Sequence, residues 1–124
     1  IREHLDTDIC LPAAGQGAVG IECASDAADV KALLAAINHD DTSVCVRAER
    51  MISAGLGADC TLPIGAYAQL RGDEICISGF VSDIQGDNFA QGFAEGPRMD
   101  ARELALDVTQ QLISQGADKL ISAE

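Results

Sequence analysis

Residues 64–82 have the sequence IGAYAQLRGDEICISGFVS, which contains the clearest β-hairpin signal in the chain. Two strand-like runs, 64–71 and 74–82, are joined by the two-residue link Gly72-Asp73. A Gly-Asp link between such runs predicts a tight hairpin. Successive side chains of a strand point to opposite faces, so alternate apolar residues of the second run should face the core together. These residues are Ile75, Ile77 and Val81.

A third strand is expected after the hairpin, at about residues 88–95, following a turn at 82–88. Its inward face is ambiguous, because Phe89 and Phe93 alternate with small residues on the opposite face. The small residues are Ala90, Gly92 and Ala94.

Residues 100–115 give the clearest helical pattern. Asp100 and Glu103 resemble a capping box at the start, and Gly116 suits the position just after the end. Residues 117–124 are expected to form a tail. The predicted inner face of this helix consists of apolar residues at helical spacing, Ala101, Leu104, Ala105, Val108 and Leu112.

Another helix is predicted before the hairpin, from Thr42 to Ala54, capped by Asp41 or Thr42 and ended by glycines. Glu49 is expected on a polar face, or in contact with a partner domain. Residues 56–63 then form a loop. The predicted inward side chains are Val44, Ala48, Met51 and Ile52, and the glycines are Gly55 and Gly57.

The first 40 residues have a different character. Residues 17–23 (GAVGIEC) predict a short buried strand without an obvious partner nearby in the sequence, and residues 26–38 predict a helix capped by Ser25 or Asp26. The apolar stripe of that helix comprises Val30, Leu33, Leu34 and Ile37.

Together these patterns predict an α+β fold, a three-stranded antiparallel sheet with helices packed on one face. A strand and a helix from a neighbouring domain precede it. We expect residues 1–40 to be the end of preceding domains, with a return strand and a linker helix, and residues 41–124 to form the C-terminal domain. The chain starts at Ile1, so we expect a piece of a longer protein.

Composition excludes several classes of protein. The chain has 20 Asp and Glu against 8 Lys and Arg, a formal charge of −12, which disfavours binding to nucleic acid or to an anionic membrane surface. Aromatic residues make up only 3%, so a base-stacking surface is not expected. No apolar run approaches the roughly 20 residues that span a bilayer, and no secretory signal is visible.

The five cysteines contain no CxxC pair, and their number is odd. A disulfide framework or a zinc site is therefore disfavoured, and reduced thiols in the cytoplasm are expected. His4 and His39 lack ligand spacing, so no metal is expected. Four cysteines, Cys10, Cys23, Cys45 and Cys76, are expected to pack as small core hydrophobes.

Cys60 differs because it lies in a loop. It is either an incidental cysteine or a covalent attachment point, since a thiol is the best protein nucleophile near neutral pH. The neighbouring Asp59 disfavours the thiolate. The glycines of GQGAVG (15–20) match the spacing of a dinucleotide-binding loop, but they precede a predicted strand and not the helix that such a loop needs, so we reject that interpretation.

Two stretches, LPAAGQGAVGIEC (11–23) and RAERMISAGLGADCTLPIGAYA (47–68), together resemble the C-terminal part of porphobilinogen deaminase, also called hydroxymethylbilane synthase. The family pattern around its special cysteine is similar to L-x-G-G-C-x-x-P-I-G-x-Y-A. The residues that carry the resemblance are Leu56, Gly57, Cys60, Pro63, Ile64, Gly65, Tyr67 and Ala68, with Gly57 one position before the first glycine of the pattern.

The resemblance implies a transferase of tetrapyrrole, porphyrin and heme biosynthesis that joins four porphobilinogen units into hydroxymethylbilane and releases ammonia. It implies a dipyrromethane cofactor held by a thioether on Cys60, and it places Gln16 and Gly17 near the growing pyrrole chain. The catalytic carboxylate and an arginine cluster lie in the family's first two domains, so no catalytic residue is expected here and the chain alone should be inactive. The chain departs from the family pattern at Asp59, where glycine is usual, and at Ala24, where arginine is usual.

Two other classes of function stay open from the residues alone. One is a non-enzymatic α+β module that binds a partner through its surface. The other is a purely structural domain with incidental free thiols.

Overall fold

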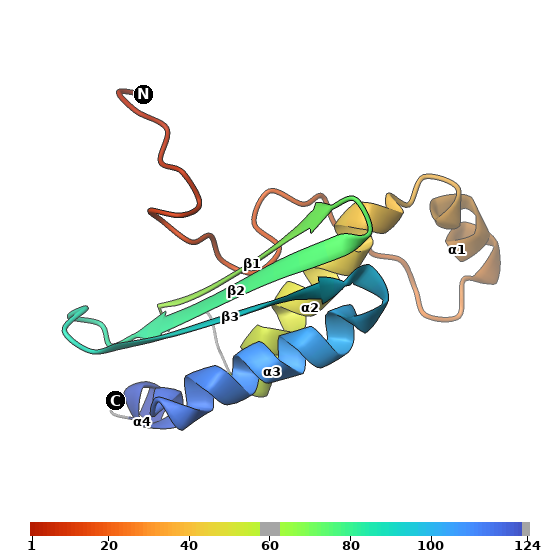
Figure 1. The fold of residues 1–124 in the computed structure, drawn as a ribbon. Helices are drawn as coiled ribbons and strands as arrows, with labels where there is room; N and C mark the ends of the chain where they lie inside the picture. Colours follow the sequence, from red (N-terminus) through yellow and green to blue (C-terminus); the bar gives the residue numbers. More distant parts are fainter. Residues whose placement is uncertain (58–62, 123–124) are drawn as a thin grey trace.

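The structure is a computed structural model that describes residues 1–57 and 63–122 (Figure 1). Three strands form one antiparallel sheet in the order β1-β2-β3, and α2 and α3 lie across one of its faces (Figure 1). The predicted α+β class is confirmed. In chain order the elements are α1 (Ala28–Ala35), α2 (Asp40–Gly55), β1 (Ile64–Arg71), β2 (Glu74–Ser82), β3 (Phe89–Pro97), the 3-10 turn η1 (Arg98–Asp100), α3 (Ala101–Ser114) and α4 (Ala117–Ser122).

The predicted hairpin is present at the predicted residues. Arg71 pairs with Glu74, and Gly72 has a φ of +68°, a left-handed conformation that glycine adopts without a steric penalty. The second strand buries its predicted face completely, with Ile75, Ile77 and Val81 all 0% exposed.

The structure resolves the ambiguous face of β3. The small residues point toward α3, while Phe89 and Phe93 point away and are 59% and 53% exposed. The reason is close packing: a Cβ added to Gly92 would lie 3.0 Å from the Val108 carbonyl oxygen of α3. The face next to this helix therefore has no room for a phenyl ring.

Helix α3 buries Ala105, Val108 and Leu112 as predicted. The predicted capping box is wrong, because Asp100 makes no side-chain cap hydrogen bond. The 3-10 turn η1 runs directly into the helix and gives Asp100 a near-helical backbone (φ −95°, ψ 13°), whereas a side-chain cap needs an extended one. Gly116 follows the helix with a φ of +92°, and the predicted tail contains the short helix α4.

Helix α2 begins earlier than predicted. Its N-cap is His39, not Asp41 or Thr42, and the His39 Nδ1 atom accepts a hydrogen bond from the Thr42 backbone N–H at 3.3 Å. The extended backbone of His39 (φ −98°, ψ 102°) brings its ring to the first turn. The same histidine was considered only as a metal ligand from the sequence.

The first 40 residues contribute little to the core. Residues 17–23 form no strand, and Val19 is 91% exposed. Helix α1 is shorter than predicted, has no side-chain cap and buries no residue, with Leu33 73% exposed. It lies apart from the sheet (Figure 1). That residues 17–23 pair with strands of another domain stays a prediction, as does the domain division at residue 41.

Candidate functional site

The candidate site is centred on the connection between α2 and β1. Helix α2 ends at Gly55, with Leu56 as its C-cap, and Gly57 follows with a φ of +66°. On the other side, the Pro63 carbonyl accepts a hydrogen bond from the Ser82 backbone N–H at 3.1 Å, which attaches the start of β1 to the end of β2. Cys60 and Asp59 lie between these two anchored ends, outside the described residues.

Gln16 and Gly17 lie in an exposed turn. The Gln16 side chain folds back onto the turn, where its Oε1 atom accepts from the Ala13 backbone N–H at 3.0 Å. Gly15 and Gly17 have φ values of +74° and +87°. Both are left-handed conformations, so the glycines allow the chain to reverse direction here.

This turn is held against β1, far away in the sequence. The Ala66 backbone N–H donates to the Pro12 carbonyl at 2.9 Å. Leu11 packs against Gly65, where an added Cβ would meet the Leu11 carbonyl oxygen at 3.1 Å. The structure thus brings the Gln16–Gly17 turn to the strand that follows the Cys60 segment.

Glu49 is the residue that sequence reasoning missed. It is only 5% exposed, and its two carboxylate oxygens accept hydrogen bonds from different segments. Oε2 accepts from the Gly15 backbone N–H at 2.7 Å, and Oε1 accepts from the Ala68 backbone N–H at 2.9 Å. A usable signal was its spacing: Cys45 lies four residues before it and Ile52 three residues after, which puts Glu49 on the buried stripe of α2.

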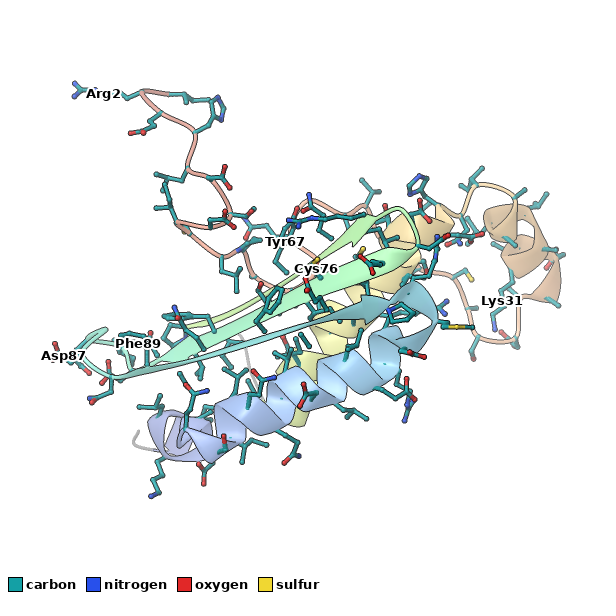
Figure 2. The ribbon with its side chains drawn as sticks, viewed as in Figure 1. Arg2, Lys31, Tyr67, Cys76, Asp87 and Phe89 are labelled. Carbon is teal, nitrogen blue, oxygen red and sulfur yellow. The ribbon has the colours of Figure 1, made fainter. Side chains whose placement is uncertain are left out.

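A groove of about 380 Å³ lies between the turn, α2 and β1. Gln16 and Gly17 line one side, and Glu49 and Tyr67 contribute to the rest. Tyr67 is on the sheet face opposite α2 and α3, as is Cys76 (Figure 2). The groove therefore runs alongside the strand that follows the Cys60 segment.

The described thiols differ in environment. Cys10 and Cys23 are exposed, so the prediction that they pack in a core is wrong; most residues around them, 1–10 and 17–25, are exposed as well. Cys45 and Cys76 are half-buried. Burial, followed by the negative charge of Glu49, raises the pKa of the Cys45 thiol above its ordinary value. This thiol is therefore protonated at neutral pH and a poor nucleophile.

The described residues contain neither a metal-binding cluster nor a membrane-spanning helix. In residues 1–57 and 63–122, no three His, Cys, Asp or Glu side chains are grouped as a metal site would need. Across the same ranges, no helix has the length and apolar character needed to cross a membrane.

Comparison with known proteins identifies the family. A family model described as "Porphobilinogen deaminase, C-terminal domain" matches residues 43–114. The chain is 40% identical over 123 residues to the porphobilinogen deaminase of Methylobacillus flagellatus, covering 99% of the chain and 40% of that protein. It is 39% identical over 122 residues to the porphobilinogen deaminase of Geobacter sp. strain M21, covering 98% of the chain and 38% of that protein.

The chain belongs to the porphobilinogen deaminase family. It spans about two fifths of the length of these relatives, and the matched domain covers α2 through α3. The name of the relatives supports a transferase of porphyrin biosynthesis as the family activity.

The structure gives physical reasons for two residues of the family pattern P-I-G-x-Y-A, Gly65 and Ala68. Gly65 leaves room for Leu11, since any side chain there would press on the Leu11 backbone. Ala68 is 5% exposed and donates its backbone N–H to Glu49. Tyr67 lies between them on the outer face. The contacts of Gly65 and Ala68 join the β1 segment of the porphobilinogen deaminase domain to residue 11 and to α2.

Proposed function

We propose that this chain is the cofactor-carrying C-terminal part of a porphobilinogen deaminase, which joins four porphobilinogen units into hydroxymethylbilane and releases ammonia. The observation that carries the proposal is the family match over residues 43–114, combined with the cysteine pattern inside it. The 40% identity to an enzyme of that name over 99% of the chain supports it.

Cys60 is the attachment residue in this proposal. A thiol sulfur is the nucleophile that a thioether requires, and the described ends on either side of the 58–62 segment are anchored at Gly57 and Pro63. Loss of ammonia from porphobilinogen leaves an electrophilic methylene carbon; the Cys60 sulfur bonds to it, and the thiol proton passes to the pyrrole nitrogen. When bound, the dipyrromethane supplies the end to which further pyrrole units are joined.

The remaining chemistry is assigned to other parts of the enzyme. Gln16 and Gly17 are proposed to lie near the growing pyrrole chain, in agreement with the groove that they line beside β1. The catalytic carboxylate and the arginines that hold acidic pyrroles are proposed to lie in the two preceding domains. A free Cys60 thiol requires a reducing compartment, so we propose a cytoplasmic location.

The attachment can be tested in a chimera in which this chain replaces the matching segment of the Methylobacillus flagellatus enzyme. We expect the intact mass of the purified chimera to include one dipyrromethane. Cys60→Ser should abolish this increment, while Cys10→Ser, at an exposed cysteine, should keep it. An unmodified chimera would contradict the proposal and would favour a non-enzymatic binding module.

The proposal that the catalytic groups lie in the preceding domains can be tested with the 124-residue chain itself. Because the chain carries a formal charge of −12, it should repel acidic pyrroles and bind them poorly. We expect the purified chain to consume no porphobilinogen, whereas the chimera should consume it. Turnover by the isolated chain would show that the catalytic groups lie within these residues.

A further inference from the structure

Glu49 contacts two segments that the proposed function brings to the cofactor. Its Oε2 atom holds the Gly15 N–H, 34 residues earlier in the sequence, and its Oε1 atom holds the Ala68 N–H, 19 residues later. Gly15 directly precedes Gln16 and Gly17, and Ala68 ends the family pattern that begins before Cys60. One side chain of α2 therefore contacts both segments.

The charge of Glu49 is accommodated without a basic partner. Within residues 1–57 and 63–122, Glu49 forms no ion pair; the ion pair found there joins Arg98 to Asp41. A buried carboxylate is costly unless its oxygens accept hydrogen bonds, and here two backbone N–H groups supply them. Only an acceptor-only group with two oxygens can satisfy both donors, because glutamine would turn an NH₂ group toward one of them.

The turn depends strongly on this contact. Gln16 and Gly17 are exposed, and the Gln16 side chain bonds within the turn. Among the described residues, the hydrogen bonds that attach residues 11–17 to β1 and α2 join Pro12 to Ala66 and Gly15 to Glu49. Without Glu49, the half of the segment nearest to Gln16 would lose its hydrogen bond to α2 and would be held only by packing, such as that of Ala14 on the core.

We propose that Glu49 is a positioning residue that fixes the Gln16–Gly17 turn relative to β1 and thereby to the growing pyrrole chain. This inference rests on the proposed function. Both carboxylate oxygens of Glu49 are engaged by backbone N–H groups, so Glu49 acts through the two backbone segments that it joins.

The structural half of the inference is tested on the 124-residue chain by amide hydrogen exchange. In Glu49→Gln we expect exchange at Gly15 or Ala68 to become at least tenfold faster, while Ala66, which bonds to Pro12, keeps its rate. Glu49→Asp keeps the charge but withdraws both oxygens, so it should show the same selective loss. Unchanged exchange at Gly15 and Ala68 in both variants would overturn the inference.

The functional half is tested in the chimera with the Methylobacillus enzyme. We expect Glu49→Gln to keep the cofactor mass on Cys60 but to lower kcat about tenfold, because a displaced turn misaligns the reacting groups. Ile52→Val, a buried substitution one turn away on α2, serves as the control for lost packing and should keep kcat. An equal fall in both variants, or no fall in Glu49→Gln, would contradict a positioning role.

The two proposals can fail separately. A wild-type chimera without cofactor would refute the proposed function, and the functional half of this inference with it. A chimera that carries the cofactor and works normally with Glu49→Gln would refute the positioning role and leave the proposed function intact.

Discussion

Asp83 organises the turn between β2 and β3. Its carboxylate accepts hydrogen bonds from the Asn88 side chain at 2.7 Å, from the Asn88 backbone N–H at 3.1 Å and from the Asp87 backbone N–H at 2.9 Å. These donors, the Asn88 side chain above all, hold the pKa of Asp83 below its ordinary value. The charged form is thus the one that fits the folded turn.

A pH dependence follows from the direction of this shift. A carboxyl whose pKa is lower in the folded state stabilises the fold above the ordinary Asp pKa, about 3.9, and loses that contribution as the pH falls through the folded value. We expect Asp83→Asn to flatten the acid limb of the stability profile between about pH 5 and pH 3. Urea unfolding at several pH values measures this effect. The control is Asp87→Asn in the same turn, and an identical profile for both variants would contradict the assignment.

Two glycines of β3 test how closely α3 sits on the sheet. An added Cβ at Gly92 would lie 3.0 Å from the Val108 backbone oxygen, whereas at Gly96 it would meet only Leu104 side-chain atoms, the nearest at 3.4 Å. We expect Gly92→Ala to destabilise the fold by about 1–3 kcal/mol, because helix backbone must move, and Gly96→Ala to cost less than 1 kcal/mol. Urea denaturation of both variants is the measurement. Equal stabilities would show that α3 can shift freely.

At the scale of elements, side chains from the two long helices cover both outer edges of the sheet. On β3, Gln111 bonds to both backbone groups of Phe93, and Gln115 does the same for Gln91. On β1, Glu49 accepts from Ala68. These glutamine amides replace the neighbouring strand that an edge lacks, which prevents the edge from pairing with another chain.

Removing the glutamine amides should therefore expose an edge. We expect Gln111→Ala/Gln115→Ala to speed amide exchange at Gln91 and Phe93 at least tenfold and to make the chain self-associate as its concentration rises. Gln110→Ala, at the exposed neighbouring position on α3, is the matched control. Sedimentation velocity and hydrogen exchange measure the two effects. A double variant that stays monomeric with unchanged exchange would show that the edge is protected by other means.

The sequence predicted the elements well and their edge contacts poorly. The hairpin and helix α3 follow from local spacing, which is visible within about 20 residues. The contacts of Gln111 and Glu49 join residues 18 to 34 positions apart and depend on how helices pack on the sheet. Similarly, the close packing of α3 decides which face of β3 points inward. The alternation of Phe and small residues in the sequence does not predict how close that helix lies.

At the scale of the whole molecule, the candidate site combines a motif with contacts that only folding creates. Cys60 was singled out by its predicted place in a loop, and its resemblance to a family pattern then gave it the attachment role. Gln16 and Gly17 came from the same resemblance, and the structure places their turn beside β1. Glu49, which holds the turn there, lies within the second resembling stretch (47–68), but its contacts become visible only when α2 is seen against both segments.

The contacts of the turn bear on the predicted division at residue 41. Residues 11–15 pack on β1 and α2 through Leu11, Pro12 and Gly15, whereas α1 buries no residue. We therefore predict that a segment from the first 40 residues unfolds together with the sheet and α2. The exposed apolar side chains between the turn and α2, such as Val19 and Leu33, contribute little to it.

Two truncations separate these contributions. A chain of residues 11–124 should keep the stability of the whole within about 0.5 kcal/mol, because residues 1–10 bury little. A chain of residues 41–124 should lose about 2–4 kcal/mol, since Glu49 loses a charged hydrogen bond and the Ala66 N–H loses its partner. Urea unfolding of the three chains, followed by circular dichroism, measures the difference. If the chain of residues 41–124 proved as stable as the full chain, the turn at residues 11–17 would contribute nothing to the stability of the C-terminal domain and would belong to the preceding domains.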